Sequence, residues 1–278
     1  KIFPDLQLWN SAEEILSKNY NSKLWNTKNG ITEDARQSED LRACAKEYVK
    51  KCRLRLLKYI PIKGKNILDM ASGPIQYPEY IEYSANFEKR YCNDLSSKAL
   101  EDAEEKIGKH GIYLHGSFFD IPLKSNYFDC SISLHTIYHI DIARQEEAIR
   151  KLINVTKPGK PVIVVYSNPR SFESFLILPL KLLIGLLKKF KFGKESIKSK
   201  YQKNYFQRHT LSWWNRFNDI ADVKVEPWRT FSARLQKVFF PNNFIGKYLF
   251  HLLFKAETRF SSFFTLFATY PMIILTKR

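Results

Sequence analysis

Apolar runs of strand length alternate with helix-like patterns through the middle of the chain. After a first short run near Asn66, further strand-like runs lie at residues 90–94, 112–117, 130–136 and 162–167. Between them, residues 96–109 and 145–155 carry apolar side chains at helical spacing. Strands that alternate with helices predict an α/β fold with a parallel, doubly wound sheet. Two later runs, 222–227 and 270–277, are predicted to be the final strands.

The segments on either side of this core have a different character. Residues 38–59 again show apolar side chains at helical spacing. Residues 1–60 are therefore predicted to be an N-terminal lid with a first helix, and residues 61–168 a ligand-binding core. Residues 169–221 are predicted to be a basic and apolar helical insertion. Residues 222–278 are expected to complete the sheet with a C-terminal helix.

The predicted insertion joins an apolar run to a basic one. The apolar run Phe175–Leu187 has 13 residues, fewer than the roughly 20 that a membrane span needs. Lysines dominate the chain from there to Arg208. This pattern suits a solvated insertion beside an acceptor site, and equally a surface that makes peripheral contact with an anionic membrane. Interleaved aromatic residues leave contact with RNA as a third option.

Composition narrows the class of protein without identifying it. The 278 residues are 44% hydrophobic and 15% aromatic, so the chain can bury a sizeable core. The formal net charge of +17 makes it a basic protein and suggests an anionic partner, either nucleic acid, lipid surface or substrate. The four cysteines show no metal-binding spacing. We expect free thiols in a reducing, cytoplasmic compartment, with membrane association left open.

The turn after the first strand carries the candidate chemistry. The stretch NILDMASGPIQYPEY places Asp69 before a turn of small residues, Ala71, Ser72 and Gly73, and then Pro74. A dinucleotide needs three glycines there, because its pyrophosphate lies against backbone N–H groups at the helix N-terminus. Proline lacks that donor but is well tolerated at the start of a helix. A nucleoside without phosphate loses nothing, so the turn favours S-adenosylmethionine.

The ends of the next strands supply groups for an adenosine ligand. Asp94 lies 25 positions after Asp69 (94 − 69), close to the roughly 20 expected for one helix and one strand before a ribose-binding carboxylate. The third strand ends in HGSFFDIPL, which offers Ser117, Phe118 and Asp120 beside an adenine. The fourth ends in SLHTIYHID.

Together, NILDMASG, CNDLSSKALEDAEEK, DIPLKSNYFDCSISLHTIYHI and VTKPGKPVIVVYS resemble a class I S-adenosylmethionine-dependent methyltransferase. The resemblance covers roughly residues 66–167 and is to the group with small-molecule, lipid or sugar acceptors. It implies a Rossmann-like, seven-stranded, mainly parallel sheet, with the core 61–168 binding S-adenosylmethionine and releasing S-adenosylhomocysteine.

The resemblance also implies roles for individual residues. In that pattern Asp69 and the Ala71–Gly73 turn lie under the methionine part of the cofactor. Asp94, followed by Leu95, holds the ribose, and the predicted adenine contacts are Ser117, Phe118 and Asp120. His135 lies close to the sulfonium. Because Ala71 and Ile75 stand where relatives have glycine, the turn is predicted to be narrower than usual, and which of Ser117 and Asp120 reaches the adenine amino group stays open.

Each of these positions also has an ordinary structural explanation. Asp94 is suited to capping the next helix, Asp120 to turn chemistry and Phe118 to core packing. His135 and His139 are candidate general bases, since histidine titrates near neutral pH, or they simply pack near the cofactor. Their spacing lacks the His-Glu-x-x-His pattern, so no metal site is predicted.

The acceptor side is less defined by sequence. Tyr20, Trp25 and Tyr138 are candidates for aromatic contact with the sulfonium and acceptor, and Tyr20 and Trp25 suit plain packing of a lid equally well. His209, within QRHTLSWWNRF, is a candidate acceptor contact at the start of a predicted helix.

Three functions follow from these observations. The first is methyl transfer to an oxygen or nitrogen of a small metabolite, glycan precursor or lipid-like acceptor. The second is RNA methylation, although the Asn-Pro-Pro-aromatic motif of base-amino methyltransferases is replaced here by SLHTIYH. The third is a non-catalytic scaffold that binds cofactor. The acceptor itself and the oligomeric state are not specified by the sequence.

Overall fold

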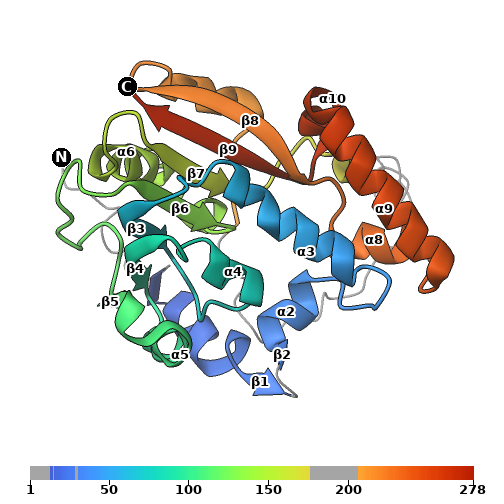
Figure 1. Ribbon diagram of the computed structural model, residues 1–278, viewed down its shortest axis with the longest axis horizontal. Coiled ribbons are helices and arrows are strands. Elements are labelled where there is room, and N and C mark those ends of the chain that lie inside the picture. Colours follow the sequence, from blue (N-terminus) through green and yellow to red (C-terminus); the bar gives the residue numbers. More distant parts are fainter. Residues whose placement is uncertain (1–12, 15, 29–30, 176–205) are drawn as a thin grey trace, which may run out of the picture.

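The fold is organised around a seven-stranded, mostly parallel sheet (Figure 1). A computed structural model describes residues 13–14, 16–28, 31–175 and 206–278. The strand order is β5-β4-β3-β6-β7-β9-β8, and only β9 runs antiparallel to its neighbours within the sheet. The strands are β3 (Gly64–Met70), β4 (Phe87–Asp94), β5 (Gly111–His115), β6 (Cys130–Leu134), β7 (Pro161–Val165), β8 (Ala221–Arg229) and β9 (Tyr270–Lys277).

This strand order leaves a crevice at one edge of the sheet. The chain runs outward from β3 through β4 to β5, and then returns to β6 on the other side of β3. The reversal leaves a crevice beyond the carboxyl ends of β3 and its neighbours, where ligands of open α/β sheets bind. The predicted mainly parallel, doubly wound sheet is confirmed, including its two late strands.

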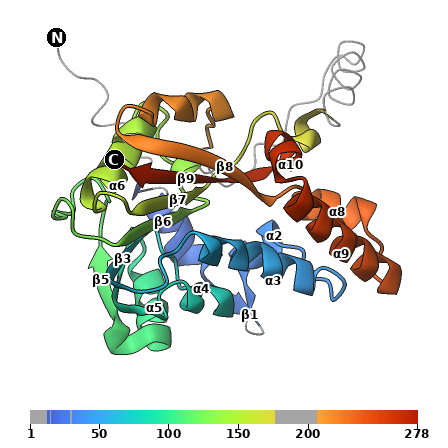
Figure 2. The same ribbon diagram turned by 45° about the horizontal axis from the view of Figure 1, so that its top comes forward.

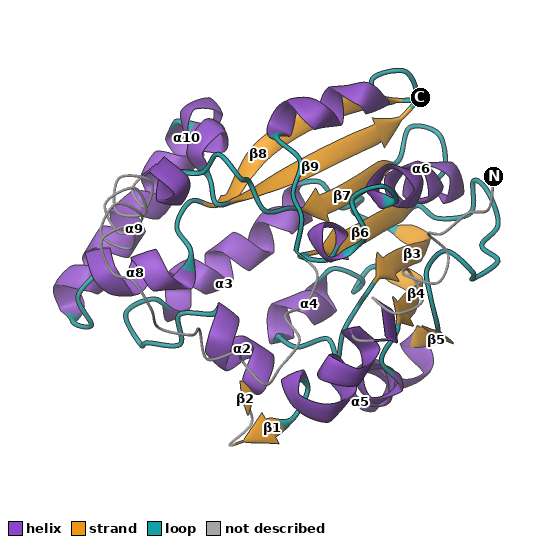
Figure 3. Cartoon of the chain, turned by 180° about the vertical axis from the view of Figure 1, so that it is seen from behind, coloured by secondary structure: helices purple, strands orange, loops and turns teal. Residues whose placement is uncertain are grey.

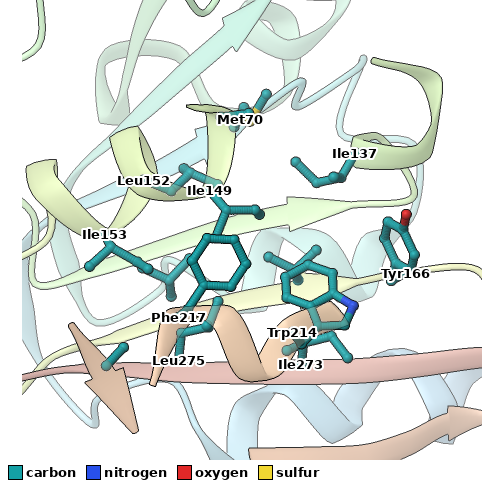
Figure 4. Packing of buried hydrophobic residues seen from close by; sticks show 14 of the residues in the cluster. Met70, Ile137, Ile149, Leu152, Ile153, Tyr166, Trp214, Phe217, Ile273 and Leu275 are labelled. Carbon is teal, nitrogen blue, oxygen red and sulfur yellow. The ribbon is translucent and has the colours of Figure 1, made fainter. Parts of the chain in front are cut away.

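Helices cover both faces of the sheet (Figure 3). On one face, α6 (Gln145–Val155) and the 3₁₀ helix η5 (Leu211–Phe217) bury a cluster that includes Ile149, Leu152, Trp214 and Phe217 (Figure 4). On the other face, residues of α4 (Pro78–Glu82), α5 (Ser97–Ile107) and the 3₁₀ helix η2 (Arg55–Lys58) form a second cluster with the sheet. Removal of these side chains from water is the main force that holds the layers together.

The N-terminal part differs from the helix predicted over 38–59. The chain forms a π-turn η1 (Tyr20–Leu24), a small hairpin of β1 (Thr27–Lys28) and β2 (Ile31–Thr32), and α2 (Glu33–Ser38). The predicted helix begins only at Lys46, as α3 (Lys46–Leu54). Glu39 is extended there, because its buried carboxylate pairs with Arg229 of β8 at 2.6 Å. Contacts from a distant strand thus override the local apolar spacing.

Three helices, rather than the single one predicted, connect β8 to β9. They are α8 (Ala233–Phe239), α9 (Phe244–Arg259) and α10 (Ser261–Phe267), which lie together at one end of the molecule (Figure 2). The α9 helix packs against α3, with the rings of Tyr48 and Phe250 stacked at 5.0 Å. Of the helices in the described ranges, none combines the length and apolar character needed to cross a membrane.

Smaller differences concern boundaries and one helix type. The strand predicted over 112–117 ends at His115, and the helix expected within 207–217 is a 3₁₀ helix. Two further short 3₁₀ segments are η3 (Gly108–His110) and η4 (Ile137–His139). Nearly all of the predicted basic and apolar insertion lies outside the described residues, including most of the run 175–208.

Candidate active site

Two adjoining cavities form one cleft at the carboxyl edge of the sheet. The larger encloses about 250 Å³ and the smaller about 80 Å³. Residues at the ends of β3, β4 and β6 line both of them, and the shared residues are Leu16, Ala71, Asp94, Leu95, Thr136 and His139. Because one set of side chains bounds both spaces, a single extended ligand can lie across them.

The turn after β3 keeps the shape of a glycine loop with few glycines. Ala71, Gly73 and Ile75 have φ angles of 55°, 57° and 47°, in the left-handed region that glycine favours. Two hydrogen bonds fix the turn to the end of β4: the Ser72 N–H donates to Asn93 O at 3.1 Å, and the Gly73 N–H donates to Asp94 Oδ2 at 2.8 Å. These contacts stabilise the turn although Ala71 and Ile75 adopt backbone angles that are strained for residues other than glycine.

Asp69 lies in the wall of the larger cavity, but a partner engages its carboxylate. Arg90 of β4 is fully buried and donates to Asp69 Oδ2 from Nε at 3.2 Å and again from Nη2. The third guanidinium nitrogen of Arg90, Nη1, donates to the carbonyl oxygen of Tyr80. The pair places Asp69 as a buried, neutralised support beneath the turn.

Asp94 is the carboxylate that borders both cavities. It ends β4, lines both cavities, and accepts backbone N–H groups of Gly73 at 2.8 Å and Ser96 at 2.9 Å. The cap of α5 is Ser96, whose side chain accepts the Ala99 N–H at 3.0 Å, so Asp94 is not that helix's N-cap. Burial raises the pKa of Asp94 to about 6, and the backbone donors oppose that rise.

The smaller cavity is where a flat base would fit. Phe118, Phe119 and Gly116 line it, together with Asn93, whose side-chain amide donates to the carbonyl oxygens of Leu114 and Gly116. Ser117 and Asp120 are not among its lining residues. The Ser117 hydroxyl instead donates to Glu13 Oε1 at 2.9 Å, and Asp120 is exposed.

The N-terminal segment 16–28 covers the cleft. The Trp25 indole packs on the turn so closely that a Cβ at Gly73 would lie 3.2 Å from it. The rings of Tyr20 and Trp25 are 5.1 Å apart, and both line the larger cavity. The Ser17 hydroxyl also donates to the Leu95 carbonyl oxygen at 3.0 Å. This segment therefore forms the roof over the turn and over Asp94.

One part of the wall of the larger cavity, which we call the chamber, is formed by residues outside the turn. Its walls combine aromatic and charged side chains: Asp34, Glu39, Tyr77, Tyr80, His135, Tyr138, Arg229 and Tyr270. Arg229 and Glu39 pair at 2.6 Å, and both are buried. Asp34 accepts a hydrogen bond from the Gln76 amide at 3.4 Å, and burial raises the pKa of Asp34 to about 6. This carboxyl group titrates close to neutrality and faces the chamber.

Comparison with known proteins relates the central part of the chain to a known protein family. Residues 68–164 match the family described as "Methyltransferase domain", a range that contains the turn, Asp94 and both cavities' central walls. This match supports an S-adenosylmethionine-dependent methyltransferase domain over these residues. The chain is 27% identical over 158 residues to the ubiquinone/menaquinone biosynthesis C-methyltransferase UbiE of Pseudomonas paraeruginosa. That match covers 49% of this chain and 59% of the relative, so the chain spans about three fifths of its length.

Solved methyltransferase structures share the fold over most of the chain. A DhpI–SAH complex superposes with a TM-score of 0.59 at 10% identity, covering 96% of this chain and 98% of the other. An S-adenosylmethionine-dependent methyltransferase of Archaeoglobus fulgidus gives a TM-score of 0.52 at 16% identity, covering 84% and 94%. At 10% and 16% identity these likenesses show a shared fold.

The three candidate histidines lie in different settings. His135 has φ 59° and is half-buried, with its ring 4.8 and 5.0 Å from the rings of Trp228 and Tyr270. Burial, reinforced by Arg229, lowers the pKa of His135 to about 3, so it is neutral and a weak base at neutral pH. His139 lines both cavities where they meet. His209 is stacked on Trp213 at 4.2 Å and lines neither cavity.

Sequence reasoning missed several residues of the cleft. Leu16 and Ser17 come from a segment without a recognisable pattern, and Asp34, Glu39 and Arg229 belong to no motif. Among the residues that the structure describes, no group of three or more histidine, cysteine or acidic side chains is placed to hold a metal ion. The four cysteines are buried and unpaired.

Proposed function

We propose that the chain transfers the methyl group of S-adenosylmethionine to an oxygen or nitrogen of a small metabolite, glycan precursor or lipid-like acceptor. The observation that carries this proposal is the continuity of the cleft, which runs from the base-sized cavity past Asp94 and the turn into the chamber. A cofactor in the first two parts would present its sulfonium at the mouth of the third. Holding acceptor and methyl group in line supplies much of the rate enhancement.

The cofactor contacts follow from the geometry. Asp94 would accept the ribose hydroxyls, with Leu95 beside it, and Phe118 would pack on the adenine. The Ala71–Gly73 turn, with Ser72 at its centre, would lie under the methionine part, supported by Asp69. Ser117 and Asp120, proposed from sequence as adenine contacts, would act only through the loop that carries them, since they do not line the cavity.

The acceptor contacts are proposed from the chamber. Tyr20, Trp25 and Tyr138 would bound the sulfonium with aromatic faces, which favour a cation. In the reaction an acceptor lone pair forms the bond to the methyl carbon as the carbon–sulfur bond breaks, leaving a neutral thioether. The acceptor proton would pass to Asp34, whose carboxyl titrates near neutrality. His139 stays a candidate for this role, whereas His135 would act by packing.

A carbon acceptor is the second candidate. It is favoured by the match to a relative described as a C-methyltransferase, which spans 158 residues. The RNA alternative depends on the basic run up to Arg208, most of which lies outside the described residues.

The test supplies methyl-labelled S-adenosylmethionine and purified chain to an extract of the source cell. The extract is then separated into organic-soluble, glycan, RNA and small-molecule pools. The proposal predicts that label enters one pool, which names the acceptor class. The label should be lost with Asp94→Ala and kept with Asp120→Ala. Asp120 is the matched control because it is an exposed aspartate outside the cleft lining. Cofactor binding without label in any pool would favour the scaffold alternative.

A further inference from the structure

The helices α8 to α10 expose an unusual amount of apolar side chain. Of the eighteen large hydrophobic side chains that are exposed among the described residues, ten lie between Val238 and Leu266. We call this set the C-terminal apolar surface; its members are Val238, Phe239, Phe244, Ile245, Tyr248, Leu249, Leu252, Phe260, Phe263 and Leu266. Figures 1 and 2 both place these helices at one end of the molecule, beyond the sheet. Apolar groups concentrated in this way mark an interaction site.

The α9 helix shows that this surface is not core packing left incomplete. Its inner side is satisfied, with Phe250 buried against α3 and Gly246 buried against Pro241. Phe244, Tyr248 and Leu252 follow one another at four-residue spacing, with exposed fractions of 81%, 61% and 42%, and the first two also border the groove between α9 and α3. A helix that is apolar on both faces is normally covered on both. The outer face therefore requires an apolar environment of its own.

The charges around the surface are of one sign. Between residues 230 and 270 the basic residues are Arg234, Lys237, Lys247, Lys255 and Arg259, and all are exposed. The one acidic residue in that range, Glu257, is buried and accepts hydrogen bonds from Tyr48, Arg55 and the Thr230 N–H. Glu47 of the neighbouring α3 is already paired with Lys51 at 3.3 Å. A second copy would bring like charges together, whereas an anionic bilayer complements them.

We propose that the C-terminal apolar surface docks the protein on an anionic lipid bilayer. Phe244, Tyr248 and Phe263 would enter the region between headgroups and acyl chains, and the lysines would contact the anionic headgroups. Two residues that line the chamber flank these helices in the sequence, because Arg229 ends β8 before α8 and Tyr270 begins β9 after α10.

Vesicle binding of the full chain tests the apolar part of this proposal. Sedimentation with vesicles of phosphatidylcholine plus phosphatidylglycerol should pellet the protein, and vesicles of phosphatidylcholine alone should pellet less. Phe244→Ser combined with Tyr248→Ser should lower partitioning at least about tenfold, since each ring buries apolar area on insertion. The matched control is Ile62→Ser combined with Ile81→Ser, two exposed residues outside this surface, which should bind as the wild type does. Circular dichroism melts of each variant check that folding is unchanged.

A charge-reversal pair tests the electrostatic part. Lys247→Glu with Lys255→Glu should weaken binding to the anionic vesicles at least about tenfold. Lys63→Glu with Lys109→Glu changes the net charge equally at exposed sites elsewhere and should have a much smaller effect. Equal loss in both pairs would mean that net charge, rather than this surface, drives binding, and would overturn the proposal.

Other results also overturn it. Absence of binding to either vesicle excludes a bilayer as the occupant. Concentration-dependent dimers that Phe244→Ser disrupts would assign the surface to a second copy. Hydrogen-exchange protection of residues 244–252 that disappears when residues 176–205 are deleted would assign it to that segment of the chain. Binding of S-adenosylhomocysteine, measured separately on each variant, keeps failure of this proposal distinct from failure of the proposed function.

Discussion

Ala71→Gly tests whether the turn under the cofactor is strained. Ala71 has φ 55°, and a non-glycine residue in that conformation costs roughly 1–2 kcal/mol. The greater freedom of glycine in the unfolded chain offsets roughly 0.4–1 kcal/mol of the relief. Ala71→Gly should therefore raise the free energy of unfolding by about 0.5–1 kcal/mol, which corresponds to an increase of roughly 2 °C in Tm. Urea unfolding followed by tryptophan fluorescence measures the change.

Ile75→Gly is the matched comparison within the same turn. Its φ of 47° would be relieved in the same way, but the side chain is only 1% exposed and packs in the cluster with Tyr80 and Tyr83. Removing a buried isoleucine costs about 2–5 kcal/mol, so the net effect should be a loss of about 2–4 kcal/mol. If Ala71→Gly is neutral or destabilising while Ile75→Gly behaves as expected, the strain argument fails for Ala71.

Three further predictions concern the cleft. Burial raises the pKa of Asp94 to about 6, and ribose hydroxyls would favour its charged form. The Kd for S-adenosylhomocysteine, measured by calorimetry, should therefore rise about tenfold per pH unit below about pH 6. A Kd that does not change with pH would contradict the ribose assignment. Trp25→Ala, which uncovers Gly73, should weaken the same Kd about tenfold, with Trp25→Phe intermediate. The wild-type kcat should rise with pH through about pH 6 as Asp34 loses its proton. Asp34→Asn should lower kcat and abolish this rise, and it should leave the cofactor Kd unchanged. A pH profile of kcat that Asp34→Asn does not alter would exclude Asp34 as the base.

Much of the fold could be predicted because its signals are local. The helix over 145–155 and the strand over 270–277 match the prediction at both ends. The apolar residues of the helix face one buried cluster, and those of the strand alternate between the clusters on the two faces of the sheet. The start of α3 could not be predicted in this way. It depends on the pairing of Glu39 with Arg229, residues 190 positions apart whose contact exists only once the sheet has formed.

The position of Asp94 at the edge of the sheet was predictable for a related reason. Parallel strands of similar length end at one edge, so Asp94 could be placed from its spacing after Asp69. The conformation of the turn was not predictable from residue types, because Ala71 and Ile75 adopt angles that their side chains disfavour. The orientation of Ser117 depends on Glu13, in a segment whose polar residues carry no periodic signal.

The chamber depends on contacts between residues that no motif connects. Asp34 and Glu39 come from the N-terminal segment, whereas Arg229 and Tyr270 flank the helices that carry the C-terminal apolar surface. The pairing of Glu39 with Arg229 leaves little net charge in that wall. Asp34 receives its hydrogen bond from a neutral amide and keeps a pKa near 6, so its protonation can change during a reaction at neutral pH. If the neighbouring helices dock on a bilayer as proposed, a carboxyl group in the chamber would suit an acceptor with one reactive polar group and an apolar remainder, the lipid-like class among the proposed acceptors.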